Sequence, residues 1–224
     1  MKIKPGYAGD PISLPENSRI VDIGSGHNPL PESTLCIERD VGSSDDRGGR
    51  DIIIPNCDLM IADVETGIPL PNKSFDFVHA SHILEHMKDP IGFCNEVSRI
   101  GNSGYIETPN PIIDYIHMDR IVHRWYIFKE RKGGLIFIKK RYTRVFILKI
   151  FPHLVDIMEY NIFFPTRYHW QGEIKCRMGT GIWDIFFNAQ IPEIKIRIVP
   201  DTPIDRILCR IFGDYKFLRW KCNR

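Results

Sequence analysis

Two glycines follow a short run of β-favouring residues, and here the sequence first indicates ligand chemistry. Residues 20–23 form the run, and Gly24 and Gly26 come directly after it. The pattern predicts a buried strand that ends in a tight loop at the carboxyl edge of a parallel sheet. Open α/β sheets bind ligands at that edge, and glycine lets the backbone approach a ligand because it has no Cβ. An ordinary strand-to-loop turn is an equal alternative, because a single glycine loop is a weak signal.

The loop lacks the features that bind a pyrophosphate. Pro29 stands where the dinucleotide fingerprint has its third glycine, Pro31 follows, and another strand-like run begins at Thr34. These residues leave no room for a long helix, whose N-terminus would hold the phosphates. The loop also contains no Lys or Arg, and a P-loop requires one. We therefore expect a ligand without phosphates, held by glycine backbone and by carboxylates.

Histidines supply candidate acid–base chemistry. His82 and His86 lie four residues apart with Glu85 between them, so on a helix the two rings would share a face. The order differs from the H-E-x-x-H zinc motif, and no metal site is expected. His82 is the predicted functional residue, whereas His86 is expected to pack or to cap. His123 is a candidate general base, with a structural hydrogen-bonding role as the equal alternative.

Other residues could contact an acceptor molecule. The aromatic cluster around His169 and Trp170 could form the floor of a sugar pocket, because sugar rings present apolar faces to aromatic rings. The alternative is that Trp170 packs in the core. Glu107, at the end of an expected strand, could bind an acceptor hydroxyl or cap a turn.

The composition is that of an ordinary globular protein of 224 residues, enough for one α/β domain with an elaborated tail. A net charge of +2 is too small to argue for nucleic acid. The six cysteines form no C-x-x-C pair, which favours free thiols in a reducing compartment, the cytoplasm. We find no signal-peptide pattern and no apolar run of about 18 residues, so no membrane span is expected.

The first half of the chain alternates strands with connections, which predicts a parallel, doubly wound sheet. Asp89 and Pro90 are expected to open a helix as N-cap and first helical residue, and Gly101 to end it. Phe93 and residues four and seven positions later form its core-facing stripe. The strands are expected at 19–23, 34–38, 58–62, 74–80 and 104–108.

The second half has a different pattern. A helix is expected over 112–123, a β-hairpin over 124–140 around Gly133 and Gly134, a late strand over 193–198 and a short helix over 203–213. The hairpin and its helices look like an insertion or cap on the sheet. A basic run could form a solvated face or make peripheral contact with a membrane; its members are Lys129, Arg131, Lys132, Lys139, Lys140, Arg141, Arg144 and Lys149.

Three motifs together resemble a known family. They are Val21-Asp22-Ile23-Gly24-Ser25-Gly26; Ala62-Asp63-Val64-Glu65 followed by Ile68-Pro69-Leu70-Pro71-Asn72-Lys73-Ser74-Phe75-Asp76; and Ser81-His82-Ile83-Leu84-Glu85-His86 with Asp89-Pro90. In this order and spacing they are similar to the class I S-adenosylmethionine-dependent methyltransferases, in the ubiquinone-methyltransferase-like (type 11) branch. The match covers about residues 19–110, and Glu107-Thr108-Pro109-Asn110-Pro111 also looks like that branch. The missing first helix departs from the family.

The resemblance implies a single domain over residues 1–224, with a Rossmann-like, doubly wound, seven-stranded sheet whose last strand is antiparallel. A hairpin and helical cap at about 111–180, after strand five, would bind the acceptor. The cofactor would be S-adenosylmethionine, with the glycine loop under its methionine part and Glu38, preferred over Asp40, on the ribose. Asp63 and the Val64 backbone would meet the adenine. The full set of implied cofactor residues is Asp22, Gly24, Ser25, Gly26, Glu38, Asp63, Val64, Ala80, Ser81 and His82.

The resulting functional expectation is a cytoplasmic O-methyltransferase that acts on a sugar hydroxyl of a glycan or glycan precursor. His123 and His82 are the expected catalytic residues. Glu107, Trp125, His169 and Trp170 are the expected acceptor contacts. The alternatives are methylation of a quinone, lipid or small aromatic, and a catalytically inactive binding module with the same fold.

Overall fold

The structure is a computed structural model that describes residues 1–6, 10–42, 50–53, 56–111, 114, 122–140 and 165–190. The helices expected over 112–123 and 203–213 and the strand expected over 193–198 fall almost entirely outside these residues. Within them, no helix is both long and apolar enough to cross a membrane.

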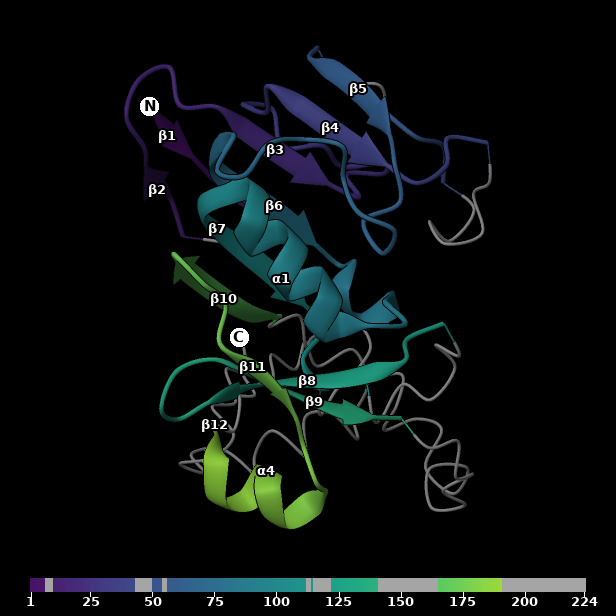
Figure 1. Cartoon of the computed structure of the whole chain (residues 1–224), viewed down its shortest axis with the longest axis vertical. Helices are drawn as coiled ribbons and strands as arrows, with labels where there is room; N and C mark the ends of the chain where they lie inside the picture. Colours follow the sequence, from purple (N-terminus) through teal and green to yellow (C-terminus); the bar gives the residue numbers. More distant parts are fainter. Residues whose placement is uncertain are drawn as a thin grey trace, which may run out of the picture.

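A central sheet of six strands carries the first half of the chain (Figure 1). Five strands are parallel and the last is an antiparallel edge strand. The strand order is β10-β7-β6-β3-β4-β5, so the chain runs outward from β3 in one direction and then from β6 in the other. The point between β3 and β6, where the direction reverses, is where such sheets bind ligands. The strands are β3 (Ile20–Ile23), β4 (Leu35–Glu38), β5 (Asp58–Ile61), β6 (Phe75–Ser81), β7 (Gly101–Thr108) and β10 (Thr166–Gln171).

The expected doubly wound sheet is therefore confirmed. The described part of the chain contributes six strands to it, and the late strand expected over 193–198 lies outside the described residues. The antiparallel strand β10 comes from a segment that the sequence suggested only as an aromatic cluster. As expected, no helix separates β3 from β4.

Helix α1 (Pro90–Ile100) covers one face of the central sheet, in front of β6 and β7 (Figure 1). It begins as the sequence predicts, because Asp89 Oδ1 accepts hydrogen bonds from the backbone N–H groups of Ile91 (3.1 Å) and Gly92 (2.9 Å). Phe93 and Val97 of its apolar stripe are fully buried. The helix therefore fixes the position of the short segment before it, η2 (Leu84–His86), which borders the site.

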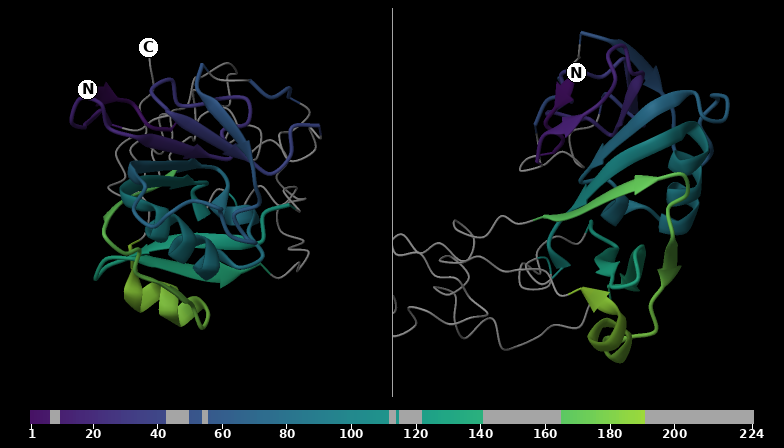
Figure 2. Two further views of the ribbon diagram at one scale, coloured as in Figure 1. Left: turned by 45° about the horizontal axis from the view of Figure 1, so that its top comes forward. Right: turned by 90° about the vertical axis from the view of Figure 1, so that its left-hand side faces the viewer.

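The opposite face is covered by a small antiparallel pair, β1 (Lys2–Ile3) and β2 (Ile12–Ser13) (Figure 2). The sequence predicted only an irregular lead-in here. Two-residue strands carry too little periodicity to be recognised in a sequence. Ile3 nevertheless packs with Phe77 and Tyr105, which point away from the α1 side, so the lead-in completes the core of the sheet.

A second sheet of four strands lies beside the first, with the order β11-β9-β8-β12 (Figure 1). The predicted hairpin is confirmed, and Gly133 (φ +87°) and Gly134 (φ +119°) form its turn. Residues 166–171 belong to the central sheet, and the chain returns to the second sheet after them. Its elements are β8 (Trp125–Glu130), β9 (Leu135–Lys139), β11 (Cys176–Met178), α4 (Ile182–Asn188) and β12 (Ala189–Gln190).

Candidate active site

A cleft opens at the carboxyl ends of β3, β4, β5 and β6, at the point where the sheet changes direction. Each strand contributes the residues that follow it, because parallel strands end at the same edge. The lining residues are Ile23, Gly24, Gly26, Ile37, Glu38, Arg39, Asp40, Ala62, Asp63, Val64, His82, Ile83, His86 and Met87.

The glycine loop passes along the floor of the cleft in a conformation that requires glycine. Gly24 (φ +68°) and Gly26 (φ +55°) both have left-handed backbone, which L-residues with a Cβ adopt at a cost. A Cβ on Gly24 would also lie 2.5 Å from Cδ1 of Ile83. Both glycines are therefore fixed by local geometry, as the sequence suggested.

Glu38 connects this loop to the neighbouring strand. Its Oε1 accepts hydrogen bonds from Ser25 Oγ (2.7 Å) and from the backbone N–H of Gly26 (2.7 Å), while Oε2 makes no hydrogen bond to the described residues. Asp40, the alternative from the sequence, also lines the cleft, and its Oδ1 accepts from the Gly42 N–H. Both carboxylates therefore remain candidates for binding a diol.

Asp63 and Val64 lie on the other side of the cleft, after β5. The Asp63 Oδ1 accepts from the backbone N–H of Glu65 (2.9 Å), an Asx-turn that sets the direction of the carboxylate. The position agrees with a role at the far end of an elongated ligand.

Asp22 supports the loop from below and does not line the cleft. Its Oδ2 accepts from the Leu30 N–H (2.7 Å), and its Oδ1 lies 2.7 Å from Nδ1 of His79. The Gly6 N–H donates to Nε2 of His79, so the His79 proton lies on Nδ1 and is donated to Asp22. Three more of the expected cofactor residues are also absent from the described lining: Ser25, Ala80 and Ser81.

His82 has the least usual backbone in the site, with φ at +56°. Such strain in a residue with a Cβ is typical of functional positions. Its ring lies between two carboxylates, Glu85 and Glu107, each 3.5 Å from one of its nitrogens. Burial lowers the pKa of His82, but Glu107 and Glu85 outweigh that effect and raise the pKa to about 9. The ring is therefore cationic at neutral pH and forms an ion pair with each of these carboxylates.

Glu107 is buried behind His82 and away from the cleft. It accepts hydrogen bonds from Tyr105 Oη (2.5 Å) and Ser81 Oγ (3.3 Å). The structure thus gives it a role in fixing the carboxyl ends of β6 and β7.

His123 lies behind His86, and it is His86 that lines the cleft. The two rings meet edge to face with centroids 4.8 Å apart. The Nδ1 of His123 lies 2.8 Å from Asp114 Oδ1, and Asp114 Oδ2 pairs with Lys140 Nζ (2.6 Å). The sequence did not indicate Asp114, placed Lys140 only in the basic run, and suggested that His86 packs or caps. No local spacing joins residues from η2, position 114 and the second sheet.

Trp125, Trp170 and His169, which were expected to contact the acceptor, lie away from the described lining of the cleft. Trp125 is buried, and its Nε1 donates to Met87 O (2.7 Å). Trp170 packs over Gly104, where a Cβ would lie 2.7 Å from its ring; this is the core packing that the sequence left open. His169 is exposed, with its ring 4.9 Å from that of Tyr105.

Comparison with known proteins agrees with this geometry. Residues 38–106 match the model of a family described as a methyltransferase domain. No curated protein matches the sequence.

Solved structures show only a distant likeness. The chain is similar to the YcgJ protein from Bacillus subtilis (19% identity over 46% of this chain and 51% of that chain, TM-score 0.34). It is similar to an S-adenosylmethionine-dependent methyltransferase from Mesorhizobium loti, with 21% identity over 58% of this chain and 61% of that chain and a TM-score of 0.34. It is also similar to one from Aquifex aeolicus, with 18% identity over 44% of this chain and 60% of that chain and a TM-score of 0.33. The chain spans about half the length of the first of these. The TM-scores are low, so the structural likeness adds no argument to the family match.

The matched segment runs from the end of β4 to β7 and supplies most of the cleft. The doubly wound sheet is the one that the sequence motifs implied, and the glycine loop and three carboxylates lie at its ligand edge. The match of residues 38–106 to a methyltransferase domain, in this order of motifs, supports a class I S-adenosylmethionine-dependent methyltransferase.

Proposed function

We propose that this protein is a cytoplasmic enzyme that transfers the methyl group of S-adenosylmethionine to a hydroxyl oxygen, and that the acceptor is a sugar of a glycan or glycan precursor. The observation that carries the proposal is the composition of the cleft. Glycine backbone and three carboxylates line one part of it, and two imidazoles line another.

The residues of the cleft fit an adenosine sulfonium. Glu38 Oε2 and Asp40 offer acceptors for a ribose diol, which carboxylates bind well. Asp63 is placed to accept from an adenine amino group, and Gly24 and Gly26 allow close approach of the methionine part. The bound cofactor supplies an activated methyl group, and the carboxylates favour its positive charge.

The imidazole side of the cleft fits an oxygen acceptor. Transfer requires that the two reactants be held in line, and a hydroxyl must also lose its proton. His82 is charged and lies between two carboxylates, and its positive charge favours an acceptor oxygen that becomes negative as its proton leaves. We propose that His123 takes the proton, with His86 between it and the cleft.

Two measurements test the proposal. Calorimetry should detect S-adenosylmethionine binding that Asp63→Ala weakens at least about tenfold, a loss of roughly 1.4 kcal/mol. Binding without any methyl transfer would indicate an inactive binding module, and no binding would reject the proposal. Radiolabelled methyl transfer should then be measured on sugars, quinones, lipids and small aromatics; label on the other acceptors but on no sugar would exclude the glycan assignment.

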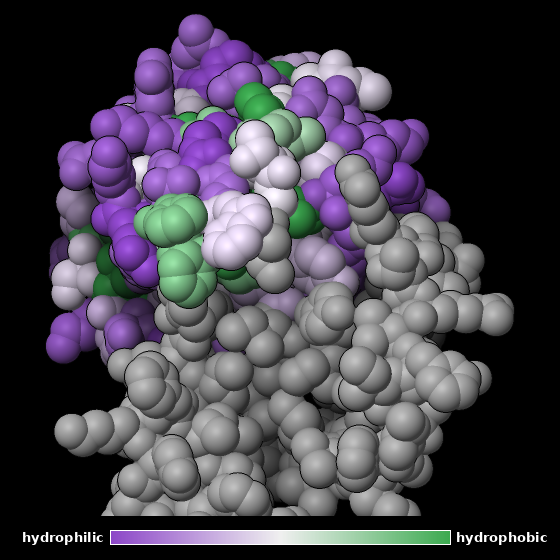
Figure 3. Space-filling view, turned by 90° about the horizontal axis from the view of Figure 1, so that it is seen from below, coloured by the Kyte–Doolittle hydropathy of each residue, from purple (hydrophilic) through white to green (hydrophobic). Residues whose placement is uncertain are grey.

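We also propose peripheral contact with an anionic membrane surface through α4. Trp183, Phe186 and Phe187 are 71%, 59% and 63% exposed, and α4 lies at the lower end of the described residues in Figure 1. Seen from below, a small group of hydrophobic side chains interrupts a mainly hydrophilic surface (Figure 3). Arg131, from the basic run, donates to the backbone carbonyls of Phe186 and Ala189, so positive charge lies beside the C-terminal end of α4. This combination is typical of interfacial membrane binding.

Replacing Trp183→Ser and Phe187→Ser together should reduce co-sedimentation with vesicles that contain anionic lipid. The reason is the loss of the apolar area that enters the interface. Phosphatidylcholine vesicles serve as the control, because they lack the charge that Arg131 would meet. Equal binding of wild type and variant to anionic vesicles would contradict this contact.

A further inference from the structure

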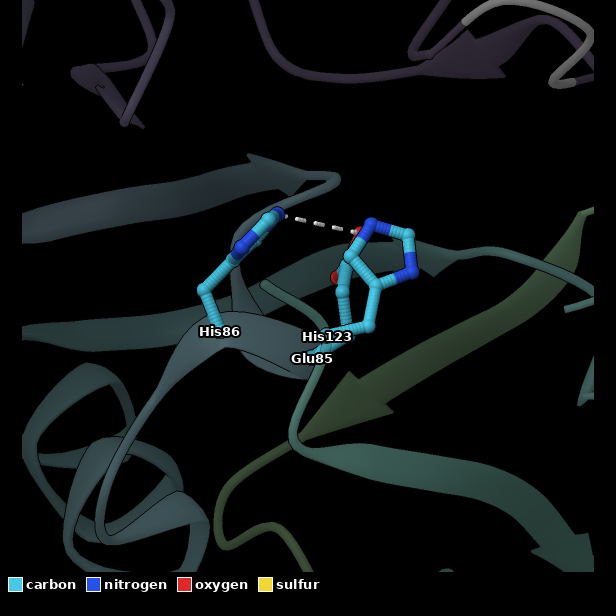
Figure 4. Close-up of side chains that lie close together, drawn as sticks. All are labelled: Glu85, His86 and His123. Carbon is cyan, nitrogen blue, oxygen red and sulfur yellow. Dashed lines mark ion pairs between the residues drawn. The ribbon is translucent and has the colours of Figure 1, made fainter. Parts of the chain in front are cut away.

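Three potential metal ligands converge beside the cleft. Glu85 and His86 come from η2, and His123 comes from the segment that enters β8; their side chains point toward one another (Figure 4). One ligand atom from each lies within 4.8 Å of the other two. His86 lines the cleft, so this cluster has one open side.

Glu85 is the least satisfied group of the cluster. Its side chain is 1% exposed, and neither carboxylate oxygen has a hydrogen bond among the described residues. The nearest nitrogens belong to His82 (3.5 Å) and His86 (3.8 Å), too far for good hydrogen bonds. A buried anion that lacks donors is costly unless it is paired or coordinates a metal.

His123 is held in the tautomer that a metal requires. Asp114 accepts from Nδ1 and is itself anchored by Lys140, which leaves the Nε2 lone pair as the available ligand. A carboxylate behind a metal-binding histidine is the usual supporting arrangement in such sites. His123 is 3% exposed and does not itself line the cleft, so a bound ion would connect it to the cleft.

The two segments that carry the cluster are fixed to each other. The Arg124 N–H donates to Glu85 O (2.7 Å), Arg124 Nε donates to His86 O (3.1 Å), and Trp125 Nε1 donates to Met87 O (2.7 Å). These bonds hold the residue after His123 against the segment that carries the other two ligands. The site is therefore positioned by rigid backbone, as a metal site needs.

We propose that Glu85, His86 and His123 bind a divalent transition-metal ion, zinc by the chemistry of the donors, with its open position toward the cleft. Two imidazoles and one carboxylate with a free fourth position are a known ligand set of catalytic zinc. The site was not expected from the sequence, because His123 lies far along the chain from the other two.

The geometry requires only a small adjustment. Ligands at about 2.1 Å from a tetrahedral ion lie about 3.4 Å from one another. The separations here, up to 4.8 Å, must therefore close by up to about 1.4 Å on binding. His86 is partly exposed, so rotation of its side chain can provide much of that movement.

The role of the ion rests on the proposed function, whereas its binding does not. An acceptor hydroxyl on the open position would be more acidic than in water. Its oxygen would bond to the methyl carbon as the carbon–sulfur bond breaks, with the electron pair of that bond going to sulfur and the hydroxyl proton to water. In this role His123 is a metal ligand and not the general base. Turnover that requires added metal would support the ligand role, and turnover without metal would support the base role.

The test uses the full chain after removal of metal with a chelator. Calorimetry with Zn²⁺ should find one site, and Co²⁺ should give visible bands typical of nitrogen and oxygen ligands. His123→Ala and Glu85→Gln should each weaken Zn²⁺ binding at least about tenfold, and Asp114→Asn about 10- to 100-fold through loss of ligand orientation. Circular dichroism checks that each variant folds. If His123→Ala or Glu85→Gln does not fold, the Zn²⁺ affinity of Asp114→Asn still tests the proposal.

Cys57→Ser is the matched control, because Cys57 lies 3.6 Å from Cys36 and the pair could bind zinc by itself. This variant should bind Zn²⁺ as the wild type does. Loss of binding in Cys57→Ser, thiolate bands with Co²⁺, or unchanged affinity in His123→Ala and Asp114→Asn would overturn the proposal. S-adenosylmethionine binding in the same samples shows whether the proposed function survives such a result.

Discussion

Gly24→Val should abolish detectable S-adenosylmethionine binding, with a loss in affinity of at least about a hundredfold. Left-handed backbone costs a residue with a Cβ about 1–2 kcal/mol, and Gly24 has φ at +68°. The new side chain would also meet Cδ1 of Ile83, which itself lines the cleft. The loop would have to move away from the position in which its backbone meets a ligand. Calorimetry with S-adenosylmethionine measures the effect.

Gly172→Val is the matched control. Gly172 has a similar φ of +78°, but a Cβ there meets no atom within 4 Å, and the residue lies away from the described lining of the cleft. Both variants have the same kind of backbone strain, so both should melt at a lower temperature, Gly24→Val more so because of its contact with Ile83. Only Gly24→Val should lose binding. Similar affinity in the two variants would show that the glycine loop is not the ligand floor.

Glu38→Ala should produce the second large effect, on binding and stability together. The change removes the acceptor of two hydrogen bonds, from Ser25 Oγ and the Gly26 N–H. Hydrogen bonds to charged groups contribute about 1.5–3 kcal/mol each, and both donors would be left unpaired at a buried position. We expect a fall in affinity for S-adenosylmethionine of about 10- to 100-fold and a lower melting temperature.

Glu38→Gln distinguishes the charge from the hydrogen bonds. Glutamine retains one acceptor oxygen for the loop but not the anion, so its effect should be intermediate. Asp58→Ala, on the neighbouring strand and exposed, removes a carboxylate without these contacts and should change neither property. If Glu38→Ala bound the cofactor as tightly as Asp58→Ala does, Asp40 would be the better candidate for the ribose.

The first half of the fold was predictable because its signals are local. The strand-to-glycine transition at Gly24, the Asp89 cap and the apolar stripe of α1 each depend on residues a few positions apart. The ligand edge followed from them, since parallel strands must end together. The sequence could not show that Asp22 supports the loop without lining the cleft, because the direction of a side chain on a buried strand depends on its neighbours.

The histidine side of the site was predictable only in part. His82 and His123 could be singled out by residue type, but the partners that define their roles come from distant segments. His86 and His123 meet where Arg124 bonds to His86 O in η2 and Trp125 bonds to Met87 O just after it. Trp170 shows the same limit: its place over Gly104 depends on β10 pairing with β7, which the spacing of aromatic residues does not encode.

The hydrogen-bonded chain that runs from Gly6 through His79 and Asp22 to Leu30 links the first residues of the protein to the glycine loop. Gly6 itself has left-handed backbone (φ +65°), and a Cβ there would collide with the carboxylate of Glu107. A mutational screen for lost activity would thus score Gly6 together with Gly24, although Gly6 does not line the cleft. Sensitivity to mutation at the start of this chain reports on the support of the loop, and should not be read as a map of ligand contacts.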